Sequence, residues 1–175
     1  MSIDKREHLP DAIYLDANNL RSAGINLDKQ WIAELASFTK EFGILLCIPE
    51  LVLEEWCKYI FDQLESSRQK LDSAINFLGD YNVAVPVYDK KFLILPNRDQ
   101  LKQIVKERLI NFGFEIIPNW NGNMEELIGE AIRKIAPFDD KGKGFCDTII
   151  VESSILHAIN TFENPRVTVI SNDEV

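Results

Sequence analysis

Four acidic side chains lie far apart in this chain, each beside an apolar run: Asp16 in AIYLDANN, Glu55 in IPELVLEEW, Asp147 in KGKGFCDTII and Asp173 in VTVISNDEV. Carboxylate oxygens are ligands that Mg²⁺ and Mn²⁺ favour. Such an ion can activate a water for in-line attack on a phosphodiester and stabilise the charge on the leaving oxygen. Because four clustered acids repel one another unless a cation neutralises them, the set predicts a divalent-metal site with hydrolytic chemistry.

Each acid also has a structural interpretation that needs no metal. Asp16 and Asp173 follow β-prone runs, where aspartate often caps a helix or forms a turn. Glu55 has Glu54 beside it, and the helix macrodipole favours acids in a first turn. The neighbours of Asp147 are apolar enough to be buried, so its charge needs a partner, which is either the helix N-terminus with a loop lysine or a cation. The joint pattern favours the metal interpretation.

The chain shows no obvious nucleophile with its own base. Its two histidines are His8, in the polar N-terminal lead, and His157, expected to be a packed or partly exposed helix residue. Cys47, Cys57 and Cys146 contain no CxxC pair, so they give no zinc signature and are expected to be small apolar filler in a reducing compartment. Metal-activated water requires no such side chain.

The expected elements place the acids at one edge of a sheet. Alternating strand and helix patterns predict an α/β fold, a three-layer α/β/α sandwich around a central, mainly parallel sheet. In such sheets ligands gather where the strands end. Strands are predicted at 12–15, 44–48 and 167–170, and helices from an Asp28 cap to Gly43 and at 51–78, 99–112, 124–135 and 145–159.

Some segments carry more specific expectations. Residues 18–24 predict a turn-rich exit from the first strand. The run 51–78 is one long helix, or two with a break near Ser66 and Ser67. The helix at 145–159 is apolar on most faces and is therefore expected deep in the fold. Three β-prone runs contain or precede prolines, so one or two of them are expected as edge strands or extended connections; they lie at 81–87, 92–95 and 114–117.

Composition sets broader limits. The 175 residues, 46% of them hydrophobic, are enough for one domain with a substantial core. The net charge of −9 argues against coating of nucleic acid by bulk charge, although bound cations would reverse the sign locally. Arg98, Lys102 and Lys106 are interrupted by acids and predict an ordinary exposed helix face. The polar N-terminus and the absence of a membrane-length apolar stretch predict a cytoplasmic protein without membrane contact.

The four motifs resemble those of the PIN-domain family of nucleases. LDANN is similar to its first-strand motif, IPELVLEEW to its strand-then-helix motif, GFCDTII to its central Asp motif, and VISNDEV to its late strand with Ser, Asn and Asp. The motifs occur in the family's order, and the resemblance covers most of the chain. It implies one PIN-like nuclease domain over residues 1–175. By this resemblance the catalytic, metal-binding acids for Mg²⁺ or Mn²⁺ are Asp16, Glu55 (favoured over Glu54 because apolar Trp56 follows), Asp147 and Asp173, with Asn18 as a polar support.

The resemblance further implies a metal-dependent endoribonuclease, although acids alone do not distinguish RNA from DNA. Lys141 and Lys143, flanked by glycines, are candidate phosphate contacts, and a solvated loop is the equal alternative. The competing function is an inactive PIN-like scaffold that binds RNA or protein. The long helix and the Lys/Gly loop resemble a bacterial defence- or toxin-associated branch, which implies a homo-oligomer or an antitoxin or effector partner. Family members normally continue beyond the fourth acid, so the resemblance implies either a chain truncated at its C-terminus or a genuinely minimal form. A truncated chain would leave the strand at 167–170 uncovered.

Overall fold

The computed structural model describes residues 8–81, 83, 94–133, 135 and 144–171. These residues form four strands and six helices. The strands are β1 (Ala12–Leu15), β2 (Leu45–Pro49), β3 (Phe114–Ile117) and β4 (Val167–Ile170), and the helices are α1 (Ala17–Ser22), α2 (Gln30–Phe42), α3 (Glu50–Asp80), α4 (Arg98–Asn111), α5 (Met124–Ile132) and α6 (Phe145–Thr161).

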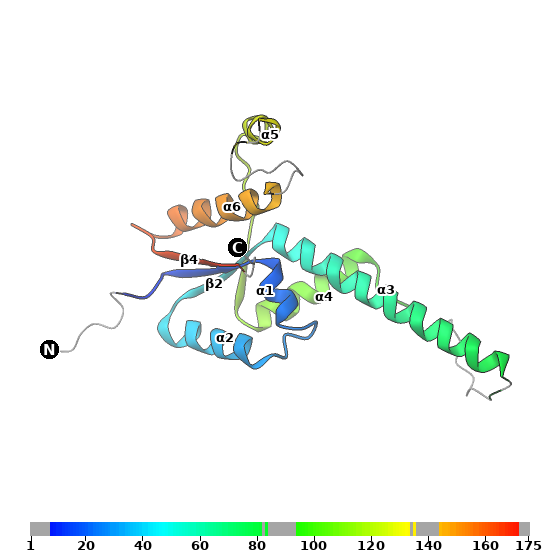
Figure 1. Cartoon of the computed structure of the whole chain (residues 1–175). Helices are drawn as coiled ribbons and strands as arrows, with labels where there is room; N and C mark the ends of the chain where they lie inside the picture. Colours follow the sequence, from blue (N-terminus) through cyan, green and yellow to red (C-terminus); the bar gives the residue numbers. More distant parts are fainter. Residues whose placement is uncertain (1–7, 82, 84–93, 134, 136–143, 172–175) are drawn as a thin grey trace.

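The four strands form one parallel sheet in the order β3-β2-β1-β4. All four side chains of β1 are buried, as expected for a strand covered on both faces. Helix α6 covers one face of the sheet, while α2, α3 and α4 lie on the other (Figure 1). The predicted three-layer α/β/α sandwich with a parallel sheet is therefore confirmed.

The direction of the strand order reverses at the C-terminal end of β1. The connection from β1 leads to β2 on one side, whereas the connection from β3 crosses to β4 on the other side. Open α/β sheets bind ligands at such a reversal, beyond the carboxyl ends of the strands. Asp16 follows β1 directly, so it lies at this reversal.

Residues 17–22 after β1 form helix α1, so the prediction of a turn-rich exit was wrong for these residues, although residues 23–27 do form turns. Asp16 caps α1: its Oδ1 accepts a hydrogen bond from the Ala17 N–H at 2.5 Å. Leu20 is fully buried, and the buried Asn19 donates from Nδ2 to the Ile170 carbonyl at 2.6 Å. The cap and these tertiary contacts outweigh the low helix propensity of the two asparagines.

The sequence prediction for the two ends of α2 is confirmed at the C-terminal end only. Lys29, and not Asp28, occupies the N-cap, with no side-chain hydrogen bond. The Asp28 carboxylate instead lies against Gly24, where a Cβ would come within 2.6 Å of Oδ1. The predicted stop is confirmed, because Gly43 has φ +65° and ends the helix in the left-handed conformation that glycine adopts without a Cβ penalty.

Helix α3 is continuous through Ser66 and Ser67, and it extends well beyond the sheet (Figure 1). Of the three β-prone runs, the one at Phe114–Ile117 is the edge strand β3, as expected. Tyr81 is the C-cap of α3, and Ile94 and Leu95 are not in a strand. The other residues of the first two runs lie outside the described residues, apart from Val83, which is also not in a strand.

Helix α6 is not deep in the fold, contrary to the prediction from its apolar composition. One side of it is buried, at Ile150, Ser153, Ser154 and Ala158. The other side is open, with Val151 41%, Ile155 42% and Ile159 62% exposed. Among the described residues no further layer covers this outer side, so apolar composition alone did not predict burial. None of the described helices has the length and apolarity to cross a membrane.

Candidate active site

Asp16 is held at the junction of β1, α1 and β4. Its backbone N–H donates to the Ile170 carbonyl at 3.2 Å, and its carboxylate accepts hydrogen bonds from the Ala17 N–H at 2.5 Å and the Ser171 hydroxyl at 3.3 Å. The residue is only 8% exposed. These three contacts fix the carboxylate at the carboxyl ends of β1 and β4.

Glu55 lies in the second turn of α3 and is half-buried. Burial raises the pKa of its carboxyl, and the negative charge of Asp16 raises it further. A hydrogen bond from the Cys146 thiol and the charge of Arg21 oppose this rise, while Asp147 adds to it. The carboxylates of Asp16, directly after β1, and of Asp147 in α6 thus both act on Glu55 of α3, although Asp16 and Asp147 are 131 positions apart in the sequence.

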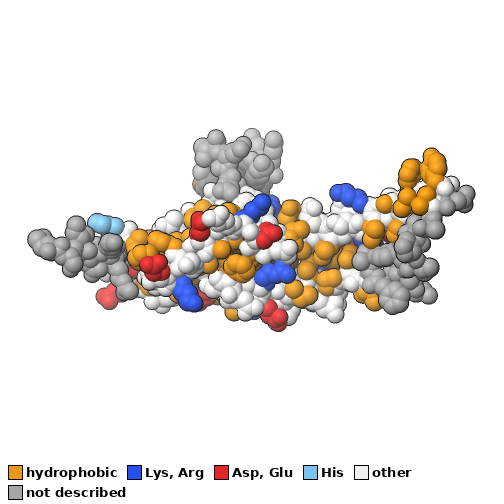
Figure 2. All heavy atoms as spheres, turned by 90° about the horizontal axis from the view of Figure 1, so that it is seen from below, with side chains coloured by type: hydrophobic (Ala, Val, Ile, Leu, Met, Phe, Trp, Pro, Cys, Tyr) orange, Lys and Arg blue, Asp and Glu red, His pale blue; other side chains and the backbone are white. Residues whose placement is uncertain are grey.

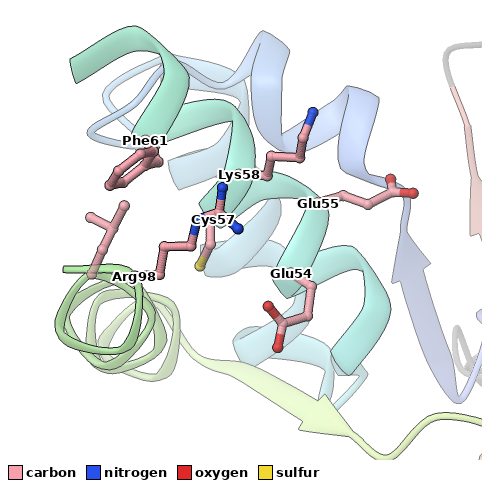
Figure 3. Close-up of a pocket in the computed structure, with 7 residues that line it drawn as sticks. Glu54, Glu55, Cys57, Lys58, Phe61 and Arg98 are labelled. Carbon is pink, nitrogen blue, oxygen red and sulfur yellow. The ribbon is translucent and has the colours of Figure 1, made fainter. Parts of the chain in front are cut away.

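The Glu54 side chain points away from Glu55, toward α4 (Figure 3). It forms an ion pair with Lys102 of α4, whose ammonium also lies 3.1 Å from Glu50 Oε1. Successive residues of a helix point about 100° apart, and Figure 3 shows Glu54 and Glu55 leaving α3 in different directions. Of the two neighbouring acids, Glu55 is therefore the one that interacts with Asp16.

Asp147 lies in the first turn of α6 and is exposed, so the expectation that its neighbours bury it was wrong. The N-cap residue of the helix is Gly144, which has φ +97° and offers no side-chain cap. Cys146 is also exposed, which corrects the prediction that all three cysteines are buried filler; Cys47 and Cys57 are buried. The charge of Asp147 nevertheless raises the pKa values of both Glu55 and the Cys146 thiol.

Arg21 is a cation whose charge acts on Glu55. Its guanidinium donates to Asn18 Oδ1 at 3.0 Å and lies 5.6 Å from the centre of the Tyr59 ring. Asn18, predicted as a polar support, is partly exposed and contacts this arginine. Sequence reasoning missed Arg21 because residues 17–22 were not recognised as a helix. It missed Cys146 because an odd cysteine beside an acid gives no motif.

The described acids suit a divalent ion in their chemistry. All three are carboxylates, and the repulsion that raises the pKa of Glu55 is what a bound cation would relieve. Within the described ranges, no three potential ligands already lie close enough together to enclose an ion. A closed cage is not required, because Mg²⁺ commonly keeps several waters and binds through one or two carboxylates. Asp173, Lys141 and Lys143 lie outside the described residues.

His157 lies on the opposite side of the sheet from α3 and takes no part in this site. Its Nδ1 lies 2.8 Å from the Tyr14 hydroxyl, and its Nε2 lies 3.7 Å from a Glu115 oxygen. The prediction of a packed, partly exposed helix histidine is confirmed.

Comparison with known proteins yields one match. A family model described as "PIN domain" matches residues 13–175, a span that contains all four acids predicted from the sequence. No curated protein and no solved structure matches the chain significantly.

Proposed function

Since the chain belongs to the PIN-domain family and has a nuclease-like fold, we propose that it is a metal-dependent endoribonuclease. The observation that supports this proposal is the convergence of Asp16, Glu55 and Asp147 from three elements at the carboxyl end of β1. Asp173 is proposed as the fourth acid, because it follows β4, the strand beside β1.

The three described acids differ in how firmly they are held. Asp16 is the preorganised ligand, since three hydrogen bonds fix its backbone and carboxylate. Glu55 is oriented by the Cys146 thiol, and the exposed Asp147 is the acid that an incoming substrate reaches first. When bound, Mg²⁺ or Mn²⁺ would supply an activated water and stabilise the negative charge on the scissile phosphate.

Substrate binding is proposed to depend on cations at the site. Lysines, arginines and acids are interspersed on the face seen in Figure 2, in keeping with the net charge of −9. Arg21 is the cation whose charge reaches Glu55 most strongly, and Lys141 and Lys143 of the Lys/Gly loop are proposed as further phosphate contacts. RNA is the proposed substrate, and a DNA strand of the same sequence is the comparison that tests it.

A non-cleaving scaffold is the second candidate function. It is favoured by the absence, in the described part of the chain, of a close group of three potential ligands. It is also favoured by Asp16 Oδ1, which already caps α1. A scaffold would bind RNA or protein with no dependence on divalent ions.

The deciding experiment is an RNA cleavage assay with matched variants of α3 and α6. Wild-type protein is incubated with mixed single-stranded RNA in Mn²⁺, in Mg²⁺ and in excess chelator, beside Asp147→Asn and the control Glu54→Gln. We expect metal-dependent cleavage by the wild type and by Glu54→Gln. Asp147→Asn should lose more than the roughly 10–100-fold that removal of an outer-shell partner costs. Full activity in chelator, or in a folded Asp147→Asn, would exclude the proposal.

A protein partner is also proposed, on the resemblance alone. Either a second copy of the chain or an antitoxin or effector protein would fit it. Light scattering of the purified chain tests the first alternative: a strictly monomeric protein at all concentrations would rule out the homo-oligomer.

A further inference from the structure

Two hollows lie on either side of one ridge of α3, next to the candidate active site. The first, of about 280 Å³, lies between α3 and α4, and Phe61, Arg98 and the buried Leu101 line it (Figure 3). The second, of about 370 Å³, is lined by Arg21 and Tyr59. Glu55 and Lys58 line both hollows, so one acid of the proposed catalytic set stands between them.

The sequence of α3 explains this arrangement. Residues at 54, 57, 58 and 61 follow the i, i+3, i+4, i+7 spacing of one helix face, and residues at 55, 58, 59 and 62 follow it on the adjacent face. The first set lines the hollow toward α4 and the second lines the hollow toward α1. One helix therefore serves both hollows.

Each hollow contains an arginine over an aromatic ring. The Arg98 guanidinium lies 5.4 Å from the centre of the Phe61 ring, and the Arg21 guanidinium lies 5.6 Å from that of Tyr59. Both rings are only partly buried. A pair of this kind at a surface is a platform on which a planar, π-faced group can stack.

Helix stability does not account for Arg98. It is the first residue of α4, where the macrodipole disfavours a cation. The start of that helix is already satisfied by the reciprocal hydrogen bonds of Asn97 and Gln100. Arg98 is exposed, as predicted, but its guanidinium also covers Phe61. Lys102 is only partly exposed and pairs with Glu50 and Glu54 of α3, so the prediction was wrong for this residue.

Lys58, on the ridge, is available to bind a phosphate. Its ammonium lies 3.6 Å from Asp62, with the two side chains 74% and 57% exposed. An exposed i, i+4 pair of this kind contributes little and exchanges readily for another anion. Lys58 thus places an exposed and weakly paired ammonium group about one helical turn from Glu55.

We propose that the two hollows bind single-stranded nucleotides on either side of the scissile phosphate. One base stacks on the Phe61–Arg98 pair and another on the Tyr59–Arg21 pair, while Lys58 contacts the phosphate between them. Bases stack in this way on aromatic rings and guanidinium planes. The two hollows, of about 280 and 370 Å³, lie just below and just above the lower end of the roughly 300–1,000 Å³ range of small-molecule sites, which suits one base each. Paired bases in a duplex cannot enter, so the site selects single strands. This inference rests on the proposed function.

The test measures binding separately from cleavage. Fluorescence anisotropy with a labelled single-stranded RNA and its duplex is recorded in Mg²⁺, using the full chain carrying Asp147→Asn so that the RNA stays intact. Into this parent are placed Phe61→Leu, Tyr59→Leu and Arg98→Gln. The matched control is Phe77→Leu, which alters an aromatic residue of the same helix that packs on Tyr81, far from the site.

We expect each site variant to weaken binding of the single strand by roughly 5- to 100-fold, the loss of one stacked base. Duplex binding and the control should be unchanged. Lys58→Met should lower the slope of log affinity against log salt by about 0.7, the value for one phosphate contact on a single strand. Circular dichroism melts of each variant establish that it is folded, and Arg98→Gln leaves both rings in place.

The outcomes separate this inference from the proposed function. Metal-dependent cleavage by the wild type, with all three stacking variants binding like the Phe77→Leu control, would overturn the stacking site and leave the nuclease intact. Absence of both cleavage and RNA binding in the wild type would overturn both.

Discussion

The two halves of α3 belong to one continuous helix but have opposite surroundings. The proximal half, residues 50–60, contains the five buried side chains of the helix, which are Val52, Leu53, Trp56, Cys57 and Ile60. The distal half, residues 65–80, contains none, and Phe77 is 60% exposed. Hydrophobic side chains gather at the far end of this half, at the right of Figure 2. Only the proximal half is held by the core.

This difference shows how the site is positioned. Burial of Trp56 and its neighbours against the sheet fixes the rotation of α3, and that rotation directs Glu55 toward Asp16 and Glu54 toward Lys102. The distal half relies on local contacts, such as the 3.2 Å ion pair of Arg68 and Glu65 at its start. If burial determines the contribution of each half to stability, substitutions in the proximal half should lower the free energy of unfolding more than substitutions in the distal half.

The largest effect is expected from Trp56→Ala in the proximal half. Removing this fully buried ring should destabilise the protein by about 3–5 kcal/mol, the usual cost of deleting a large core side chain. Urea unfolding measures it. Trp56→Phe is the control and should cost less, because among the described residues the buried indole N–H has no hydrogen-bond partner to lose. A loss below about 1 kcal/mol for Trp56→Ala would contradict core anchoring of this half.

A smaller effect is expected from Lys102→Met, which removes the cation that joins α4 to Glu50 and Glu54. Because these ion pairs are partly exposed, the substitution should lower the free energy of unfolding by about 0.2–1 kcal/mol. Hydrogen bonds to Glu54 and Glu50 raise the pKa of Lys102 above its ordinary value of 10.5. A lysine whose pKa rises on folding contributes stability that is complete below its unfolded pKa and disappears as pH rises through the folded value.

The difference between wild type and Lys102→Met should therefore be constant near neutral pH and shrink above pH 10.5. Unfolding curves of both proteins across this range provide the measurement. A difference that grew with alkaline pH would show that the lysine acts by packing and not by charge.

The smallest effect is expected from Phe77→Ala in the distal half. Its ring contacts that of Tyr81, with centroids 5.0 Å apart, but both side chains are mostly exposed. We expect a change within about 0.5 kcal/mol in urea unfolding, as for surface substitutions elsewhere. A loss as large as that of Trp56→Ala would mean that this half is packed in solution, and its dependence on protein concentration would then distinguish packing within the chain from packing between copies.

Much of this architecture was predictable from the sequence. The strands β1, β2 and β4, the stop at Gly43 and the long α3 follow from β-branched runs, turn chemistry and 3.6-residue periodicity. These signals are local, so they need no knowledge of neighbours. The ordering of the motifs also indicated that Asp16 and Asp147 would lie near enough to Glu55 for their charges to act on it, since ligands and the helices that carry them gather beyond the strand ends.

The features that were missed depend on tertiary contacts. Helix α1 exists because Leu20 enters the core and Asn19 bonds to β4, which no local pattern of asparagines reveals. The exposure of Asp147 depends on what covers α6, and apolar composition does not give that. The contact of Arg98 with Phe61 was missed because the two residues lie 37 positions apart on different helices.

The central claim is that Asp16, Glu55 and Asp147 bind one divalent ion, and Mn²⁺ titration followed by electron paramagnetic resonance tests it most directly. We predict saturable binding by the wild type and by Glu54→Gln, whose acid faces Lys102. Asp147→Asn should bind much more weakly, and wild-type stability should rise by about 2.7 kcal/mol at a hundred times the dissociation constant. Equal Mn²⁺ binding by wild type and Asp147→Asn, or none by the wild type, would contradict the account.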